Sequence, residues 1–272
     1  MHDEVTRPAP ATPATDRHRR DDAREAFGLT WVLARKNFQV RYKRATLGVL
    51  WAVLQPAAQA AVLAFVFSRV IGIGKTSHYA LFVLCGVLPW AFFSQSVAAA
   101  TTSVVDNDSL VKKVALPLSI FPLAAIGGTT LAFFAALPIL LVGTVLSGSV
   151  GLHLLLLPVA FGLELVLIVA FGLLTSALHP ALRDVKYLVE SGLLIGFYAT
   201  PVLYDPSQLT GTLPKLLPFN PFTGILSLFR GAVLGRSVDW TAVGLTVLIS
   251  AVVGLVGASA FRRRSDEFAD LV

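Results

Sequence analysis

The stretch "LHLLLLPVAFGLELVLIVAFGLLTSAL", residues 152–178, decides the fold class of this chain. It runs for 27 residues with a single charged side chain, Glu164. A helix of roughly 20 apolar residues is long enough to cross the hydrocarbon core of a bilayer. The whole sequence agrees, because 55% of its 272 residues are hydrophobic and 14% are charged, against about 25% charged in soluble domains. The sequence therefore predicts a membrane protein.

Five other stretches have a comparable length and composition. The six predicted transmembrane segments are residues 47–70, 79–104, 119–147, 152–178, 187–204 and 238–261. The fifth is the shortest, although it could still span with little tilt. We expect an all-α membrane protein with six transmembrane helices. Residues 27–272 would form one membrane domain, preceded by a polar, disordered cytoplasmic tail at 1–26.

The distribution of Lys and Arg predicts the orientation. If the N-terminus is cytoplasmic, most of the 22 Lys and Arg residues fall on the inner side, as the positive-inside rule requires. Both termini are then cytoplasmic. Gly74-Lys75-Thr76 ends like a phosphate-binding loop, but Arg69 stands where the first glycine should be and the loop would be external. The positive charge thus reflects topology, and we expect neither nucleotide nor nucleic acid to bind this chain.

Residues 26–48 predict a helix lying in the membrane interface. Its apolar stripe recurs every three or four residues. The members of this stripe are Phe27, Trp31, Ala34, Phe38 and Tyr42. Cations on the other face and at the inner end would lie near anionic headgroups. Two interpretations stay open: a simple anchor, or a lever that also contacts a cytoplasmic partner.

The internal loop at residues 104–122 predicts a short capped helix. Asp106 and Asp108 can cap its start, and Pro117 ends it. One interpretation is a plain turn with lysines reaching to the membrane surface. The other is a docking element that inserts two apolar side chains into a partner beside an acidic rim. Its surface would comprise Ser109, Leu110, Val111, Lys112 and Lys113.

The external segment at residues 204–236 is unusually apolar for a loop. Its run from Phe222 to Leu234 is too short to span. Pro218 and Pro221 divide the segment, and Asn220 is placed to cap the second part. We expect two short helices that dip into the outer leaflet and return, bordering a pathway. An amphipathic pair resting on the outer surface is the alternative.

Aromatic residues gather on the same side of the membrane. They are Trp90, Phe92, Phe93, Phe197, Tyr198 and Tyr204. An interfacial aromatic belt is one explanation. Aromatic rings also offer flat faces over which sugar rings can slide, so these residues could line a path for a long glycan.

Candidate catalytic and metal-binding groups are sparse. His179 has no second ligand at a useful spacing. Glu164 is the only clearly intramembrane charge, which makes it a functional candidate, although a neutral glutamate at a helix contact is the simpler interpretation. We expect no catalytic residue, metal or cofactor in this chain.

Several stretches resemble one family: permease subunits of type-2 ABC exporters that move lipid-linked polysaccharides such as O-antigen, teichoic acid, capsule and galactan. The similar stretches are "RYKRATLGVLWAVLQP", "LCGVLPWAFFSQSV", "NDSLVKKVALPLSIFPLA", "RDVKYLVESGLLIGFYATPVLYDPSQL", "LPFNPFTGILSLFRG" and "FRRRSDEFADLV". They cover the chain from about residue 27 to 272, in order. The family usually has Pro-Arg after the two lysines, and here Leu118 replaces that arginine.

The resemblance implies a homodimer in the bacterial plasma (inner) membrane, with two separate ATPase subunits that bind ATP and Mg. It implies that residues 109–116 correspond to the coupling helix and residues 27–44 to the interfacial gate helix. The external gate would include Phe219, Asn220, Phe222 and Arg230. The cargo would be a polyprenyl-pyrophosphate-linked glycan, and a cationic cluster could attract its pyrophosphate from the inner leaflet. That cluster is Arg41, Lys43 and Arg44.

Three other functions are alternatives to this one. A drug or small-lipid exporter of the same fold is the closest alternative. A membrane-embedded transferase would need clustered carboxylates for metal and diphosphate, and the paired carboxylates here lie in polar tails. A secondary transporter would need several intramembrane charges.

Overall fold

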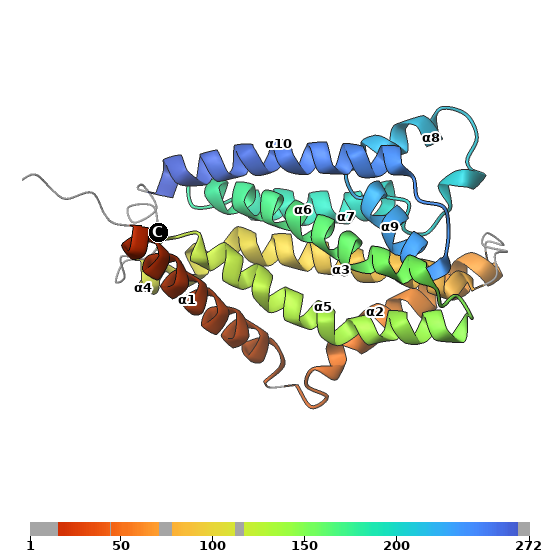
Figure 1. Cartoon of the computed structure of the whole chain (residues 1–272), viewed down its shortest axis with the longest axis horizontal. Helices are drawn as coiled ribbons and strands as arrows, with labels where there is room; N and C mark the ends of the chain where they lie inside the picture. The colour runs from red at the N-terminus through yellow and green to blue at the C-terminus, as the bar shows by residue number, and fades with distance from the viewer. Residues whose placement is uncertain (1–15, 44, 71–77, 112–116, 266–272) are drawn as a thin grey trace, which may run out of the picture.

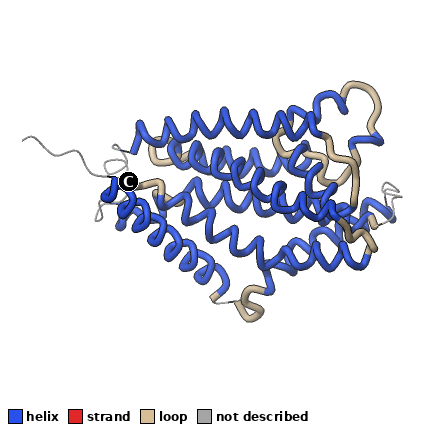
Figure 2. The backbone as a smooth tube through the Cα atoms, in the orientation of Figure 1, coloured by secondary structure: helices blue, strands red, loops and turns tan. Residues whose placement is uncertain are grey.

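A computed structural model describes residues 16–43, 45–70, 78–111 and 117–265 of the chain. Every regular element in these ranges is helical (Figure 2). The long helices are α1 (Asp16–Tyr42), α2 (Leu50–Phe65), α3 (Tyr79–Thr102), α5 (Ile120–Leu146), α6 (Leu156–Leu178), α7 (Val185–Ala199), α9 (Thr223–Leu234) and α10 (Trp240–Arg264). The short ones are η1 (Val66–Val70), η2 (Val105–Asn107), α4 (Asp108–Val111), η3 (Leu152–Leu155), η4 (Pro206–Gln208), α8 (Leu213–Leu216) and η5 (Leu217–Phe219).

Five of the six predicted spans are confirmed as helices that are long and apolar enough to cross a membrane. They occupy Leu50–Val70, Tyr79–Thr102, Ile120–Leu146, Leu152–Leu178 and Trp240–Arg264. The stretch predicted at residues 187–204 forms the 15-residue helix α7. At 1.5 Å per residue, α7 covers about 22 Å, short of the roughly 30 Å hydrocarbon core. The sixth span therefore stays a prediction, and the chain is a multi-pass membrane protein.

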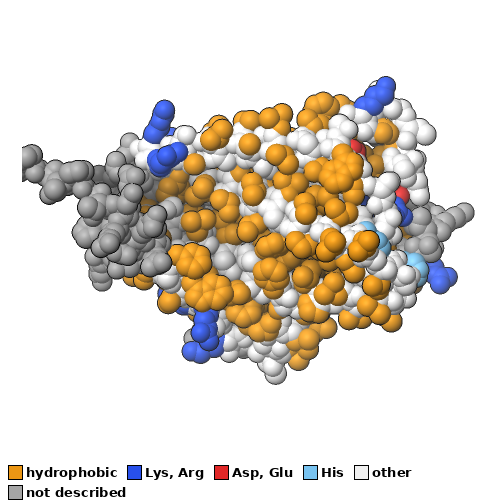
Figure 3. All heavy atoms as spheres, in the orientation of Figure 1, with side chains coloured by type: hydrophobic (Ala, Val, Ile, Leu, Met, Phe, Trp, Pro, Cys, Tyr) orange, Lys and Arg blue, Asp and Glu red, His pale blue; other side chains and the backbone are white. Residues whose placement is uncertain are grey.

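The helices run between two ends of the molecule (Figure 1). The start of α1, the short helix α4 and the last turn of α10 lie at one end, and α8 and α9 lie at the other. Figure 3 shows Lys and Arg side chains near these two ends and a largely hydrophobic band between them. This banding is what a bilayer requires of the surface that it contacts.

Helix α3 forms the centre of the structure, and the other spans surround it. It contacts α2, α5, α6, α7 and α9. Hydroxyl pairs tie it to two neighbours: Ser96 Oγ lies 2.6 Å from Thr129 Oγ1 of α5, and Thr101 Oγ1 donates to Thr175 Oγ1 of α6 at 2.8 Å. Such interhelical hydrogen bonds and small residues hold membrane helices together where lipid removes the hydrophobic driving force.

The contact between α6 and α10 is the most extensive helix pair in the described chain. It depends on Gly257, where an added Cβ would lie 2.9 Å from the carbonyl oxygen of Ala170. Asp239 begins α10 by accepting hydrogen bonds from the backbone N–H groups of Thr241 and Ala242, both at 3.0 Å. Three arginines in its last turn interact favourably with the negative end of the helix dipole.

Helix α1 differs from the prediction at its start. It begins at Asp16, before the boundary at residue 27 that the sequence predicts between the tail and the helix. Of the predicted apolar stripe, Ala34 is buried, close to Gly127 and Gly128 of α5, whereas Phe27 and Trp31 are exposed. Small residues on both helices allow the backbones to approach, and the large aromatic residues are left for the membrane.

Candidate functional site

Polar side chains lie on the outer faces of two membrane-spanning helices, where apolar ones are expected. They are Gln55 and Gln59 of α2, and Ser94 and Gln95 of α3. Together with Trp90, Phe197 and Tyr198 they line a groove of about 340 Å³ between α2, α3 and α7. We call this the amide groove. An amide that faces lipid loses its hydrogen bonds to water at a cost of about 1–3 kcal/mol, so such a surface favours contact with water or protein.

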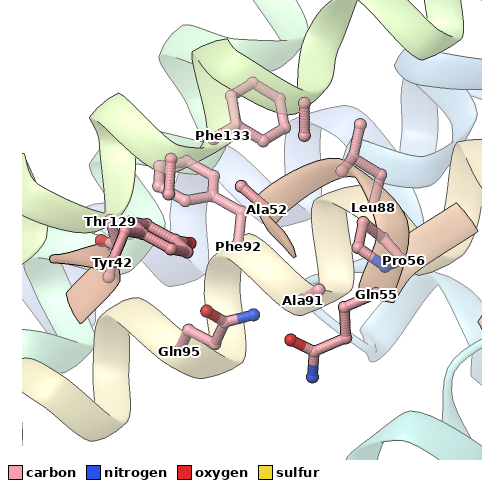
Figure 4. A pocket seen from close by; sticks show the side chains of 12 residues that line it. Tyr42, Ala52, Gln55, Pro56, Leu88, Ala91, Phe92, Gln95, Thr129 and Phe133 are labelled. Atoms are coloured by element: carbon pink, nitrogen blue, oxygen red, sulfur yellow. The ribbon is translucent and has the colours of Figure 1, made fainter. Parts of the chain in front are cut away.

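A second, smaller pocket of about 30 Å³ shares Gln55, Pro56, Ala91 and Gln95 with the amide groove. In Figure 4 the amides of Gln55 and Gln95 extend to the same side of this pocket, and the ring of Phe133 lies on the opposite side. The two glutamines therefore form one polar strip along the α2–α3 surface.

The amide groove is joined to α1 through a predicted capture residue. Arg41 Nη1 donates a hydrogen bond of 2.8 Å to Gln95 Oε1. Arg41 also lines a cavity of about 450 Å³ between α1, α3 and α5, together with Lys36 and Asp106. Lys43 lines a further cavity of about 410 Å³ at the bend between α1 and α2. The structure thus joins Arg41 to the amide groove and places Lys43 at the bend between α1 and α2. Arg44 lies outside the described residues.

Most of the aromatic residues predicted to line a path are packed within the protomer. Trp90, Phe92, Phe93 and Phe197 are buried, and Tyr198 is exposed. Trp90 stacks edge-on against Phe222 with ring centroids 5.0 Å apart. Trp90, Phe197 and Tyr198 reach the amide groove. Phe92 lines the smaller pocket, Phe93 packs in the core, and Tyr204 is half-buried beyond α7. Their role in transport stays a prediction.

The segment at residues 204–236 contains two α-helical pieces, α8 and α9, and two short 3-10 turns, η4 and η5. α8 has four residues, and α9 is confirmed as an apolar helix shorter than a span. Asn220, between them, accepts from the Phe222 N–H at 2.9 Å and donates to Thr200 Oγ1 at 2.8 Å, just beyond α7. Phe222 is buried, whereas Phe219 is exposed. The segment is therefore tied both to the end of α7 and, through Phe222, to α3.

Helix α9 is buried on nearly all sides. At Gly224 an added Cβ would lie 2.6 Å from the carbonyl oxygen of Ala242, so only glycine allows this approach to α10. Arg230, predicted to belong to a gate, is buried within this packing. It donates to the Val202 carbonyl oxygen at 2.8 Å and stacks over the Phe82 ring at 3.6 Å.

Part of the predicted docking element packs against its own chain. Val111 is 7% exposed and packs in a cluster with Val104, Phe121, Ala177 and Phe261. Leu110 packs partly against the same cluster, and Ser109 is exposed. Lys112 and Lys113 lie outside the described residues. A partner could therefore contact Ser109 and the free part of Leu110, and docking stays a prediction.

In the described part of the chain, neither Glu164 nor His179 belongs to a cluster of metal ligands. Within the described ranges, no three His, Cys, Asp or Glu residues come close enough to hold a metal ion. Both carboxyl oxygens of Glu164 are buried without a hydrogen-bond partner in the described chain. Burial lowers the pKa of His179 at the inner end, where the carboxylate of Asp106 partly opposes this effect. His179 is therefore mostly neutral at pH 7.

Sequence reasoning missed the three glutamines of the amide groove. It also missed the ion pair between Asp205, in the segment after α7, and Arg236, in the segment before α10. The glutamines do interrupt otherwise apolar stretches, which was a usable signal. The ion pair joins residues far apart in the chain, and no local pattern marks it.

Comparisons with known proteins show the family to which this chain belongs. Residues 28–234 match the family described as ABC-2 type transporter. An O-antigen export system permease protein RfbA of Klebsiella pneumoniae is 26% identical over 252 residues, covering 90% of this chain and 95% of the relative. A protein of the same name in Myxococcus xanthus is 27% identical, with the same coverage. Because the family match spans most of the chain, we conclude that this protein belongs to the ABC-2 type transporter family, as the permease subunit of a type-2 ABC exporter.

Proposed function

We propose that this chain is the membrane subunit of an ATP-driven exporter that moves a polyprenyl-pyrophosphate-linked polysaccharide from the cytoplasmic to the external side of the bacterial plasma membrane. The relatives named for O-antigen export support a polysaccharide cargo. The active assembly is a homodimer with two ATPase subunits, and these subunits bind ATP and Mg.

The observation that carries this proposal is the amide groove. Gln55, Gln59 and Gln95 can exchange hydrogen bonds with sugar hydroxyls, and the rings of Trp90 and Tyr198 offer flat contact surfaces. A passing glycan needs many weak, interchangeable contacts rather than one tight site. A surface of amides and aromatic rings supplies such contacts.

A second copy of the chain would close the amide groove into a conduit. Helix α7 is exposed over most of its surface, including Tyr187, Glu190 and Tyr198. Polar groups on a spanning helix are costly in lipid, so this surface fits a protein neighbour or a water-filled path. In this arrangement α7 and the segment after it complete the sixth span.

The cytoplasmic half of the protein would bind the cargo and would contact the ATPase that drives transport. Arg41 and Lys43 lie where the lipid pyrophosphate would arrive from the inner leaflet. The α4 region, with Ser109 and Leu110 outermost, would dock on the ATPase. A movement of α1 on hydrolysis would be transmitted to α3, because Arg41 joins the two helices at Gln95. At the external end, α9 and the Asn220–Thr200 contact would form the gate.

The test is transport in proteoliposomes that contain this chain, its ATPase and a fluorescent lipid-linked glycan. A Gln55→Leu, Gln95→Leu double variant should lower glycan export about thirtyfold, because two lost hydrogen bonds of roughly 1 kcal/mol each correspond to that factor. The matched control is Val252→Leu, an exposed position on α10, which contacts α6 and α9 away from the amide groove.

Unchanged export in the double variant would remove the groove from the pathway. If the wild-type assembly instead moves a small fluorescent lipid and leaves the glycan behind, the chain belongs to a drug or small-lipid exporter.

A further inference from the structure

A cavity of about 640 Å³ lies at the external end of the molecule, apart from the amide groove. The segment after α7 forms one wall, and α9 with the start of α10 forms another. Its charged and aromatic lining consists of Phe82, Asp205, Arg230, Arg236 and Asp239. A volume of this size can hold a small ligand or a lipid headgroup.

Arg230 is a buried cation in the lining of this cavity, and it has no anionic partner within the described chain. Its side chain is only 6% exposed, and its Nε atom has no hydrogen-bond partner in the described chain. The single hydrogen bond of the guanidinium goes to a neutral acceptor, the Val202 carbonyl oxygen. The stacked Phe82 ring compensates part of the charge. A buried cation is costly unless it is paired.

Both acidic residues that line the cavity already have hydrogen-bond partners within the described chain. Asp205 pairs with Arg236 and also accepts from Ser207 N and Oγ. Asp239 accepts from the backbone N–H groups of Thr241 and Ala242 in the first turn of α10. Neither carboxylate forms an ion pair with Arg230 within the described ranges. An external anion could therefore bind to Arg230 without displacing an existing partner.

The position of the cavity indicates which anion. Trp240, next to the lining residue Asp239, begins α10 and is 63% exposed. Exposed tryptophans at the ends of spanning helices mark the level of the lipid headgroups. Phosphate is the commonest anionic group at that level, and arginine is suited to bind it with several parallel N–H donors.

We propose that this cavity binds the phosphate group of a lipid at the outer face, with the guanidinium group of Arg230 as the central donor and Arg236 at its side. The inference deepens the proposed function and rests on it, because the diphosphate of an exported lipid-linked glycan would arrive at this side. A phospholipid headgroup carries the same chemistry and is the other source.

The experiment measures binding by titration calorimetry to the purified full-length protein in a neutral detergent, with no ATPase present. The probes are geranyl diphosphate, dihexanoyl phosphatidylglycerol and inorganic phosphate. We expect geranyl diphosphate to bind. Arg230→Gln should weaken its binding about tenfold, because a hydrogen bond to a charged group is lost. Ser237→Phe, a change at an exposed residue of the lining, should weaken it similarly by filling the cavity.

The matched control is Lys215→Gln, which removes a cation at the same end from a side chain that does not line the cavity. It should bind as the wild type does. If Arg230→Gln does not fold, Ser237→Phe decides the outcome. Additional binding of phosphatidylglycerol would assign the site to headgroups in general, and its absence would assign the site to the diphosphate cargo.

Unchanged binding in a folded Ser237→Phe variant, or binding of inorganic phosphate alone, would overturn the proposal. Since the assay involves no transport, a failure of glycan export with intact probe binding would count against the proposed function and not against this site.

Discussion

Arg41 of α1 and Gln95 of α3 are joined by a 2.8 Å hydrogen bond between a guanidinium N–H and an amide oxygen. The pair links α1 to the polar strip on α2 and α3. It lies on an exposed surface, so water can replace the partner of either group. This hydrogen bond therefore contributes little to stability, and its main effect is to fix the position of α1 relative to α3.

Replacing this cation tests its part in cargo capture. Arg41→Gln should slow glycan export about fivefold, since the loss of one contact with the cargo pyrophosphate, worth roughly 1 kcal/mol, corresponds to that factor. The triple change of Arg41, Lys43 and Arg44 to Gln should slow it further. Arg35→Gln, an exposed cation earlier on α1, is the matched control. Equal export by all of these variants would show that the cations serve topology alone.

The docking prediction can be tested at Leu110, which is only partly packed against its own chain. Leu110→Asp should reduce the amount of ATPase that co-purifies with the permease, because it places a charge beside an apolar contact, while insertion into the membrane stays intact. Val111→Asp is a poor test, since it would bury a charge inside the protomer. Normal co-purification of the ATPase with a Leu110→Asp permease would refute docking at this residue.

Two glycines of α10 make a matched pair for helix packing. Gly257→Ala should lower the free energy of unfolding by about 1–3 kcal/mol, because the new Cβ meets the Ala170 carbonyl oxygen on α6. Gly244→Ala should be neutral or stabilising by up to about 1 kcal/mol, because open space surrounds its Cβ and alanine favours the helix. Thermal unfolding in detergent measures both. Similar midpoints for the two variants would contradict the close contact.

The ion pair of Asp205 and Arg236 predicts a pH response at the external end. Burial alone would raise the pKa of Asp205, but hydrogen bonds from Ser207 and Arg236, with the charge of Arg236, hold it below its ordinary value of 3.8. Since the pKa is lowered in the folded state, the stabilisation is complete above about pH 4 and is lost as the pH falls through the folded-state pKa.

Hydrogen exchange of the segment at residues 201–208 checks this response. Protection should persist from pH 7 to about pH 4, after correction for the intrinsic exchange rate, and should fall below that. In Asp205→Asn the protection should be lower at neutral pH and should show no such step. A loss of protection in the wild type between pH 7 and pH 5 would assign the response to another group.

Hydropathy predicted the fold well wherever a segment is both long and uniformly apolar. It could not establish a sixth span at α7, because Lys186 and Glu190 shorten the apolar part and the chain turns extended at Thr200. It also placed Ala34 in one apolar stripe with the large aromatic residues of α1, whereas in the structure Ala34 makes the close contact with α5 and Phe27 and Trp31 are exposed. Steric fit between two helices decides that point, and a pattern on one helix does not contain it.

The candidate site was predicted less completely than the fold. Arg41, Trp90 and Tyr198 line cavities, and their place on a pathway stays a prediction. Phe93 and Val111 pack within the protomer instead. The sequence cannot separate these cases, because an aromatic or aliphatic side chain at a helix face suits both a lining and a core. The pairing of Arg236 with Asp205 depends on how α10 approaches the end of α7, which is a property of the tertiary structure.

The close fit of α10 on α6 has a consequence for biosynthesis. Gly257 and Ala170 are neighbours in the folded chain, yet more than eighty residues separate them along it. Helix α6 is therefore inserted into the bilayer well before its largest contact surface can be covered. During that interval the nascent chain depends on α3 and α5 to retain α6, and quality-control proteases should meet the protein in this half-assembled form.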